Sequence, residues 1–188
     1  MSGIAGIKYL DNSLLHRADL VLMLDTLAHR GPDGADIWVD GNIGLGHRML
    51  WTTPESLIEK QPLVDRVRNL AIAADARIDN REELISQLSL DNSPSDRPLN
   101  QNINQNNSCL KTVTDSQLIL EAYKKWGEDC LEYLVGDFAF AIWDGCKQTL
   151  FCARDHFGVK PFYYYQSDQV FIFASEIKAL LCLPQVPC

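Results

Sequence analysis

The stretch GDFAFAIWD (residues 136–144), with the segments that follow it, decides the fold. Large and small apolar side chains alternate in it, a pattern typical of a buried strand. TLFCARD (149–155) and PFYYYQ (161–166) are rich in aromatic and apolar residues and predict two more strands. QVFIFAS (169–175) follows after a short polar turn, so we expect it to pair with the strand before it. Short strands joined by turns indicate antiparallel sheet.

Helical and extended patterns alternate in the rest of the chain. Their order is strand, helix, several strands, helices and then antiparallel strands, which predicts an α+β domain with antiparallel sheets packed against helices. Thr114 is placed to cap the helix that it begins, and Asp79 or Asn80 to cap the helix after them. The expected elements are strands at 2–10 and 69–78, a hairpin at 36–50, and helices at 17–29, 80–88, 114–127 and 175–183.

Composition excludes several classes of protein. With 188 residues, 46% of them hydrophobic, the chain is long enough for one domain with a substantial core. The net charge of −8 argues against a nucleic-acid partner and against an anionic membrane surface. No apolar run reaches the length of a membrane span, and the start lacks the pattern of a signal peptide. We therefore expect a cytoplasmic protein with no membrane contact.

The cysteines and one polar segment are two further features of the sequence. The six cysteines form no CxxC pair and no histidine lies at ligand spacing from them, so we expect reduced thiols and no metal site. Residues 91–108, DNSPSDRPLNQNINQNNS, are dominated by Asn, Ser and Pro and contain no aromatic residue. This segment has little to bury and is predicted to be a disordered insertion between two helices.

Five motifs, taken in order, resemble the class II glutamine amidotransferase domain at the front of asparagine synthetases. The resemblance covers residues 2–188 apart from the insertion, and it implies a four-layer αββα sandwich of the N-terminal-nucleophile hydrolase type. The motifs are SGIAGI (2–7), HRGPDG (29–34), GLGHRML (44–50), ARIDNREEL (76–84) and GDFAFAIWD with LFCARDHFGVKPFYYY (136–165).

Longer stretches, such as GLGHRMLWTTPESL (44–57), resemble asparagine-synthetase-related proteins associated with lasso-peptide cyclases. In such proteins a second, ATP-using domain follows and forms an amide bond. This chain carries no ATP-pyrophosphatase signature. The resemblance therefore implies a synthetase domain as partner, in cis or in trans, with ATP and magnesium bound there and no cofactor in this domain.

Ser2 stands where the family has its nucleophile. Active members use an N-terminal Cys whose own α-amine serves as base. A small residue after Met1 favours removal of that methionine, which would leave Ser2 with both a hydroxyl and a free amine. A hydroxyl is much harder to activate than a thiol, so the change weakens the case for catalysis.

The resemblance places Met49 where the family has the arginine that holds the substrate carboxylate. Losing that charged hydrogen bond costs about 1.5–3 kcal/mol. Arg48 is adjacent, but neighbouring residues on a strand point to opposite faces, so it is a poor substitute.

Three residues replace the NGE-type motif that supplies an oxyanion donor and binds the substrate amine. Asp75 is an acceptor where the family has a donor Asn, a loss worth about 2.7–4 kcal/mol. Ala76 takes the place of the glycine, and Arg77 reverses the charge of the glutamate that binds the amine. Asp115, the other amine-binding position, is retained. Because Asp75 and Arg77 share a strand face, we expect them to form an ion pair that fills the former glutamine pocket.

Other conspicuous residues are better explained by structure than by catalysis. His29 and His47 are expected to be hydrogen-bonding residues of the scaffold, and Asp33 to hold the HRGPDG turn. Arg154 and Asp155 are expected to organise the core or a domain junction, because a buried charge requires a partner. The aromatic run 162–165 predicts sheet and core packing, with a contact to the downstream synthetase domain as the alternative.

These observations lead to three hypotheses. The preferred one is a degenerate glutaminase-type domain with a structural or docking role beside an amide-forming, ATP-dependent synthetase domain, with glutamine an unlikely ligand. The second is an active amidotransferase that uses Ser2 to supply ammonia. The third is a pocket repurposed to bind a peptide or a small molecule.

Overall fold

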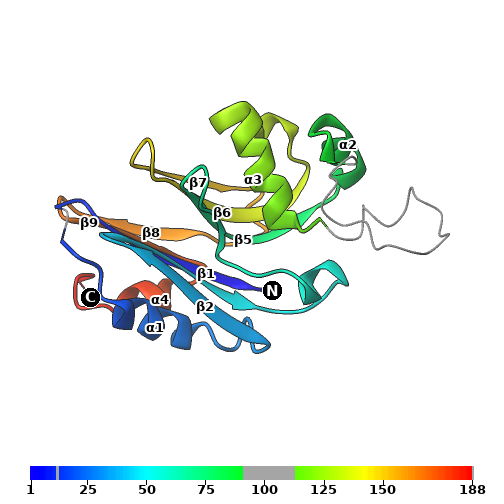
Figure 1. The fold of residues 1–188 in the computed structure, drawn as a ribbon. Helices are drawn as coiled ribbons and strands as arrows, with labels where there is room; N and C mark the ends of the chain where they lie inside the picture. The colour runs from blue at the N-terminus through cyan, green and yellow to red at the C-terminus, as the bar shows by residue number, and fades with distance from the viewer. Residues whose placement is uncertain (12, 91–112, 188) are drawn as a thin grey trace.

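A computed structural model describes residues 1–11, 13–90 and 113–187. The predicted insertion at 91–108 lies outside these residues. Two antiparallel sheets lie face to face, with helices covering the outer face of each (Figure 1).

The first sheet contains both ends of the described chain. Its order is β2-β3-β1-β9-β8, so the first strand lies in the middle, between β3 and β9. This central position makes β1 almost fully buried, as its run of apolar residues predicts. The strands are β1 (Gly3–Tyr9), β2 (Gly34–Asp40), β3 (Ile43–Met49), β8 (Tyr163–Gln166) and β9 (Val170–Ala174).

The second sheet has the order β4-β5-β6-β7. Its central pair is held by a long antiparallel register in which Asp75 lies opposite Ala139. The strands are β4 (Leu63–Asp65), β5 (Leu70–Ile78), β6 (Gly136–Asp144) and β7 (Thr149–Arg154).

Helices complete the four layers. Helices α1 (Arg17–Thr26) and α4 (Ile177–Leu181) cover the first sheet, and α2 (Arg81–Gln87) and α3 (Asp115–Trp126) cover the second (Figure 1). One apolar cluster fills each helix–sheet interface, and a third, with Trp143 and Phe173 at its centre, fills the space between the sheets. The αββα architecture expected from the resemblance is confirmed.

The predicted elements all form, with small shifts at their ends. Thr114 caps α3 as expected, since its side chain accepts a hydrogen bond from the Gln117 amide at 3.3 Å. Asn80 occupies the cap position of α2 but makes no capping bond. Its side chain instead holds residues 133 and 135 of the segment before β6. Strand β4 and two short 3-10 helices, Glu55–Leu57 and Gly127–Tyr133, were not predicted because they carry too few residues for a periodic pattern.

Gly31 brings the HRGPDG turn against β3. A Cβ at this position would lie 2.4 Å from the carbonyl carbon of Arg48, so any larger residue would push the turn away. The same turn places Arg30 beside the start of β1.

In the described ranges no helix is both long and apolar enough to cross a bilayer.

Candidate functional site

Ser2 lies immediately before β1, at the position that the resemblance gives to the nucleophile. Its Oγ accepts a hydrogen bond from the Leu50 amide at 3.2 Å, and its carbonyl oxygen accepts one from Arg30 Nε at 2.9 Å. Met1 precedes it and is 53% exposed. The hydroxyl is thus held by the backbone after β3, and no side-chain base contacts it among the residues described.

Asp75 is paired with two cations that the sequence did not indicate. It lies on β5 and is only 4% exposed. Arg30 Nη2 donates to Oδ2 at 3.3 Å, and Lys160 Nζ donates to Oδ1 at 3.0 Å. Both cations are themselves largely buried. The carboxylate is therefore fully engaged within the protein.

The predicted ion pair between Asp75 and Arg77 is wrong. The Arg77 side chain is 74% exposed and pairs with Asp79, Nε to Oδ1 at 3.1 Å. The two residues share one face of the strand, but that face is buried at Asp75 and open to solvent at Arg77. Burial at Asp75 demands nearby partners, which Arg30 and Lys160 supply, whereas Arg77 reaches water.

The loop after β7 places Lys160. Asp155 is 6% exposed and accepts hydrogen bonds from the amides of Phe157, Val159 and Lys160, at 3.1, 2.9 and 3.0 Å. Burial opposes ionisation, but these donors outweigh it and lower the pKa of Asp155. The expected organising role of Asp155 is confirmed. Arg154 is exposed, so the expectation that it is a buried, paired core residue is wrong.

Met49 and Arg48 point to opposite faces of β3, as expected. Met49 is 7% exposed. Arg48 Nε donates to the Leu24 carbonyl at 2.9 Å, and Arg48 Nη2 pairs with Asp25 at 2.8 Å, both on α1. Arg48 is thus directed to the helical layer and does not replace an arginine at position 49.

Asp115 is the first residue of α3 and is paired with Arg81 of α2. Burial raises the pKa of Asp115 to about 6, and the nearby Glu59 adds to the shift, while Arg81 and a backbone hydrogen bond with Ile78 oppose it. Ile78 is the last residue of β5 and follows Arg77 in the sequence. The hydrogen bond with Ile78 therefore places Asp115 beside the end of this strand. The structure therefore places Asp115 near the end of β5 with a cation of the protein, Arg81, already paired with it.

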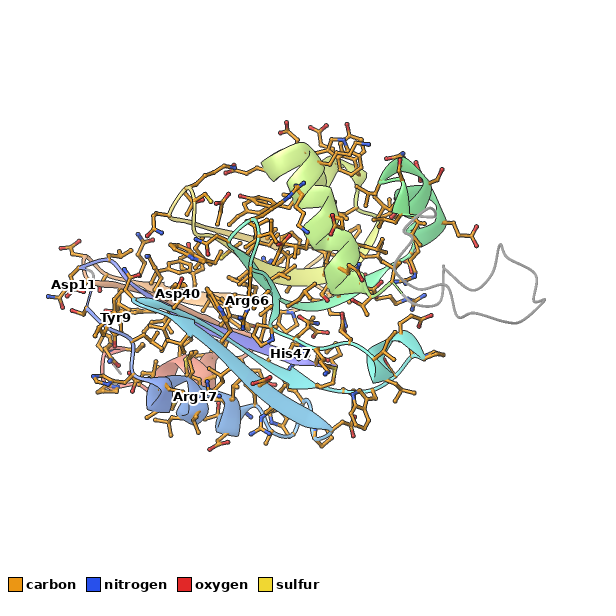
Figure 2. All side chains as sticks on the ribbon, viewed as in Figure 1. Tyr9, Asp11, Arg17, Asp40, His47 and Arg66 are labelled. Atoms are coloured by element: carbon orange, nitrogen blue, oxygen red, sulfur yellow. The ribbon has the colours of Figure 1, made fainter. Side chains whose placement is uncertain are left out.

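His47 lies inside the molecule (Figure 2) and is 1% exposed. Burial lowers the pKa of His47 to about 4, against the effect of a hydrogen bond with the Ala74 backbone. The ring is therefore neutral at pH 7 and supports the scaffold, as predicted. Asp33 Oδ2 accepts from the Trp51 amide at 2.8 Å and joins the HRGPDG turn to the segment after β3, which also agrees with the prediction.

Glu176 extends the charged network to the start of α4. Its carboxylate contacts Arg30 at 3.2 Å, His29 at 2.9 Å and Lys178 at 3.0 Å. Partial burial opposes the shift, but hydrogen bonds from Lys178, His29 and Arg30 lower the pKa of Glu176 to about 2. His29 thus belongs to the scaffold, as expected.

Sequence reasoning missed Arg30 and Lys160, although both lie in quoted motifs. Arg30 is in HRGPDG and Lys160 is the lysine of ARDHFGVKP. The only available signal was that each motif carries a cation and that a buried Asp75 would need one. Nothing in the sequence shows which cation reaches it.

Two cavities in the described part of the chain lie away from the residues to which the resemblance assigns the glutamine site. A groove of about 890 Å³ runs between β7 and β8, and a smaller hollow of about 370 Å³ lies beside Arg30 and Glu176. Neither is lined by the six predicted site residues, Ser2, Met49, Asp75, Ala76, Arg77 and Asp115. In the described part of the chain, no group of three or more acidic, His or Cys side chains is arranged to hold a metal ion.

A family model for the glutamine amidotransferase domain matches residues 1–188. The chain belongs to this glutamine amidotransferase domain family. This amidotransferase-family domain is 32% identical over 191 residues to asparagine synthetase [glutamine-hydrolyzing] 3 of Bacillus subtilis, an alignment that covers 99% of the chain. It is 33% identical to a putative asparagine synthetase of Methanocaldococcus jannaschii, again over 99% of the chain. The alignments span 28% and 36% of these relatives.

A solved structure supports the fold of the amidotransferase-family domain. Glutamine phosphoribosylpyrophosphate amidotransferase from B. subtilis superposes with a TM-score of 0.70 at 21% identity, over 96% of this chain and 43% of that one. This likeness shows the N-terminal-nucleophile hydrolase fold.

Proposed function

We propose that this amidotransferase-family domain does not hydrolyse glutamine and instead has a structural or docking role beside an ATP-dependent, amide-forming synthetase domain. The asparagine synthetases that it resembles are two to four times longer than the part it matches, which supports such a partner in cis or in trans. ATP and magnesium would bind to that partner. A particular relationship to lasso-peptide cyclases remains a prediction.

The observation that carries this proposal is the pairing of Asp75 with Arg30 and Lys160. An acyl-transfer site needs hydrogen-bond donors aimed at the developing oxyanion. Asp75 presents an acceptor at this position, and a carboxylate near an oxyanion costs about 4 kcal/mol at about 4 Å and an effective dielectric constant of 20. Its two cations lower this repulsion but do not turn Asp75 into a donor.

Substrate binding meets similar obstacles. Asp115, the position that resembles an amine-binding carboxylate, is already paired with Arg81. Arg77 would repel an ammonium group, and Met49 offers no charge to a carboxylate. Glutamine would therefore have to displace the Asp115–Arg81 ion pair at its amine end and would leave its carboxylate unpaired.

A glutaminase assay tests the proposal. We expect the wild type and Ser2→Ala to release glutamate at the same background rate, and Ser2→Cys to remain at that rate. The reason is that a better nucleophile supplies neither the oxyanion donor nor the substrate contacts. Intact mass must first show that Met1 has been removed, so that the residue at position 2 has a free amine.

B. subtilis asparagine synthetase 3 serves as the positive control for the assay. Glutamate release by the wild type that is lost in Ser2→Ala would establish the alternative of an active Ser2 nucleophile. Activity in Ser2→Cys alone would show that Met49, Asp75 and Arg77 do not block the site. Either result overturns the proposal. The hypothesis of a repurposed pocket is tested by NMR titration with peptides or amino acids. Changes in the chemical shifts of backbone amides near Asp75 would support it.

A further inference from the structure

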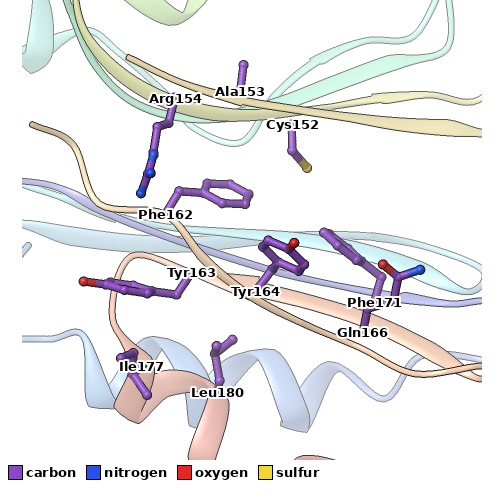
Figure 3. Close-up of a pocket in the computed structure, with 10 residues that line it drawn as sticks. All are labelled: Cys152, Ala153, Arg154, Phe162, Tyr163, Tyr164, Gln166, Phe171, Ile177 and Leu180. Carbon is purple, nitrogen blue, oxygen red and sulfur yellow. The ribbon is translucent and has the colours of Figure 1, made fainter. Parts of the chain in front are cut away.

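The groove between β7 and β8 is separate from the former glutamine pocket. Figure 3 shows it bounded by β7 above and by α4 below, with aromatic side chains between them. Phe162 stacks on Phe173 at 5.0 Å and Tyr164 on Phe171 at 5.6 Å, so the rings are held in place. Tyr164 nevertheless remains 64% exposed. The groove has a volume of about 890 Å³, which falls in the range of ligand-binding clefts.

The preferred expectation, that the aromatic run 162–165 serves sheet and core packing, holds for only part of the run. Phe162 does pack in that way. Tyr163 and Tyr164 are 41% and 64% exposed, and with Ile177 at 51% they present apolar surface along the groove.

The edges of the two sheets differ in how they are protected. Exposed edge strands are commonly blocked by charged residues or by being very short, because free backbone groups attract another strand. Edge strand β2 carries Asp36 and Asp40, and β4 has three residues, one of them Asp65. Edge strand β8, YYYQ, carries no charge. The remaining edge strand, β7, carries one charge, Arg154 at its end, and the weakly protected edges of β7 and β8 both line the groove.

Arg154 is the only charged residue among those that line the groove. It extends from the end of β7 toward Phe162 (Figure 3). Its side chain has no ion pair or hydrogen bond with any residue that the structure describes, in a chain of net charge −8. An unpaired guanidinium at the end of an apolar groove is complementary to a carboxylate.

We propose that this groove binds an extended peptide segment ending in, or carrying, a carboxylate. The peptide backbone pairs with the free edge of β8, as in other cases of strand addition. Alternate apolar side chains contact the rings of the groove, and the carboxylate accepts hydrogen bonds from Arg154. This site does not depend on the glutaminase proposal, because the two share none of the predicted site residues.

Three synthetic octapeptides of alternating valine and serine test the site on the 188-residue chain. One has a free C-terminal carboxylate, one is C-terminally amidated, and one has proline at alternate positions. We expect the first to bind and to slow hydrogen exchange of β8 amides. The amidated peptide should bind about tenfold more weakly, because a charge-assisted hydrogen bond is lost. The proline peptide should not bind measurably, because proline at alternate positions removes every second amide donor and so all the donors along one edge of the strand.

Arg154→Gln should abolish the tenfold preference for the free carboxylate. Arg66→Gln, another exposed arginine on the turn before β5 (Figure 2), is the matched control and should retain it. Both variants remove an exposed charge, so circular dichroism should show an unchanged fold.

The proposal is overturned if the carboxylate peptide does not bind at about 1 mM, the weak end of specific affinity. It is equally wrong if carboxylate and amide bind alike or if protection appears at β2 and not at β8. Protection of β8 that grows with protein concentration in the absence of peptide would show that a second copy fills the groove, and would also overturn it.

Discussion

Asp75 is a carboxylate in a nearly water-free position, with a side chain that is 5% exposed. Isolated, such a charge would be very costly to bury. Arg30 and Lys160 contact one oxygen each, and Glu176 contacts the other terminal nitrogen of the Arg30 guanidinium. Asp75 is therefore held in a network that connects β5, the HRGPDG turn and the loop after β7.

Asp75→Asn should lower the free energy of unfolding by about 3–5 kcal/mol, since it leaves Arg30 and Lys160 buried without their carboxylate. Arg77→Gln, two residues along the same strand, should change it by no more than about 0.5 kcal/mol, since its pair with Asp79 is exposed. Equilibrium unfolding in urea measures both. Equal effects would mean that the buried network does not stabilise the domain.

At the scale of elements, Glu176 joins the segment after α1 to the start of α4. It occupies the position before α4 without making a capping bond, and it is held by His29, Arg30 and Lys178. Helix α4 is short and has few bonds of its own, so this contact contributes to its attachment.

The pH dependence of stability tests this contact. The folded pKa of Glu176, about 2, lies below the unfolded value of 4.5, so its contribution is complete above pH 4.5 and is lost as the pH falls toward 2. Glu176→Gln should be less stable than the wild type by about 1–2 kcal/mol at pH 6, a value reduced for partial exposure. That difference should vanish near pH 2.

Unfolding monitored at several pH values measures the difference. Glu132→Gln, an exposed glutamate in the segment before β6, is the control and should differ from the wild type by the same amount at every pH. A constant difference for Glu176→Gln as well would refute a stabilising role for its charge.

At the scale of the whole molecule, three apolar clusters are stacked in sequence across the four layers. The cluster between the sheets contacts both of them, so neither helix–sheet layer is independent of the other. Single domains of this size commonly unfold in one cooperative step.

Leu24 lies between α1 and the first sheet, and Phe140 lies between the second sheet and its helices. Leu24→Ala and Phe140→Ala should each lower the midpoint of one shared unfolding transition. The expected costs are about 2–5 and 3–5 kcal/mol, because each leaves a cavity at a fully buried site. Phe157→Ala, at a residue that is 94% exposed, should have almost no effect. Tryptophan fluorescence and circular dichroism should report one midpoint in each variant. Two separate transitions would show that the layers unfold independently.

The sequence by itself determined the order and type of the elements. Alternation in GDFAFAIWD, the hairpin around Asp40 and Gly41 and the Thr114 cap all depend on neighbouring residues, whose periodicity and turn chemistry act locally. The motifs also assign Ser2, Met49, Asp75 and Asp115 to one family site, and this assignment stays a prediction. Strand β4 was too short to leave such a pattern.

Only the tertiary structure decided which charges meet. Arg30 and Lys160 lie 45 and 85 residues from Asp75, and no local rule connects them. Arg77 shares a strand face with Asp75, yet that face is buried at Asp75 and open to solvent at Arg77. Burial selects the partners of a charge, and burial is a property of the packed layers, so the ion pairs and the groove beside β8 emerge only when the two sheets are stacked.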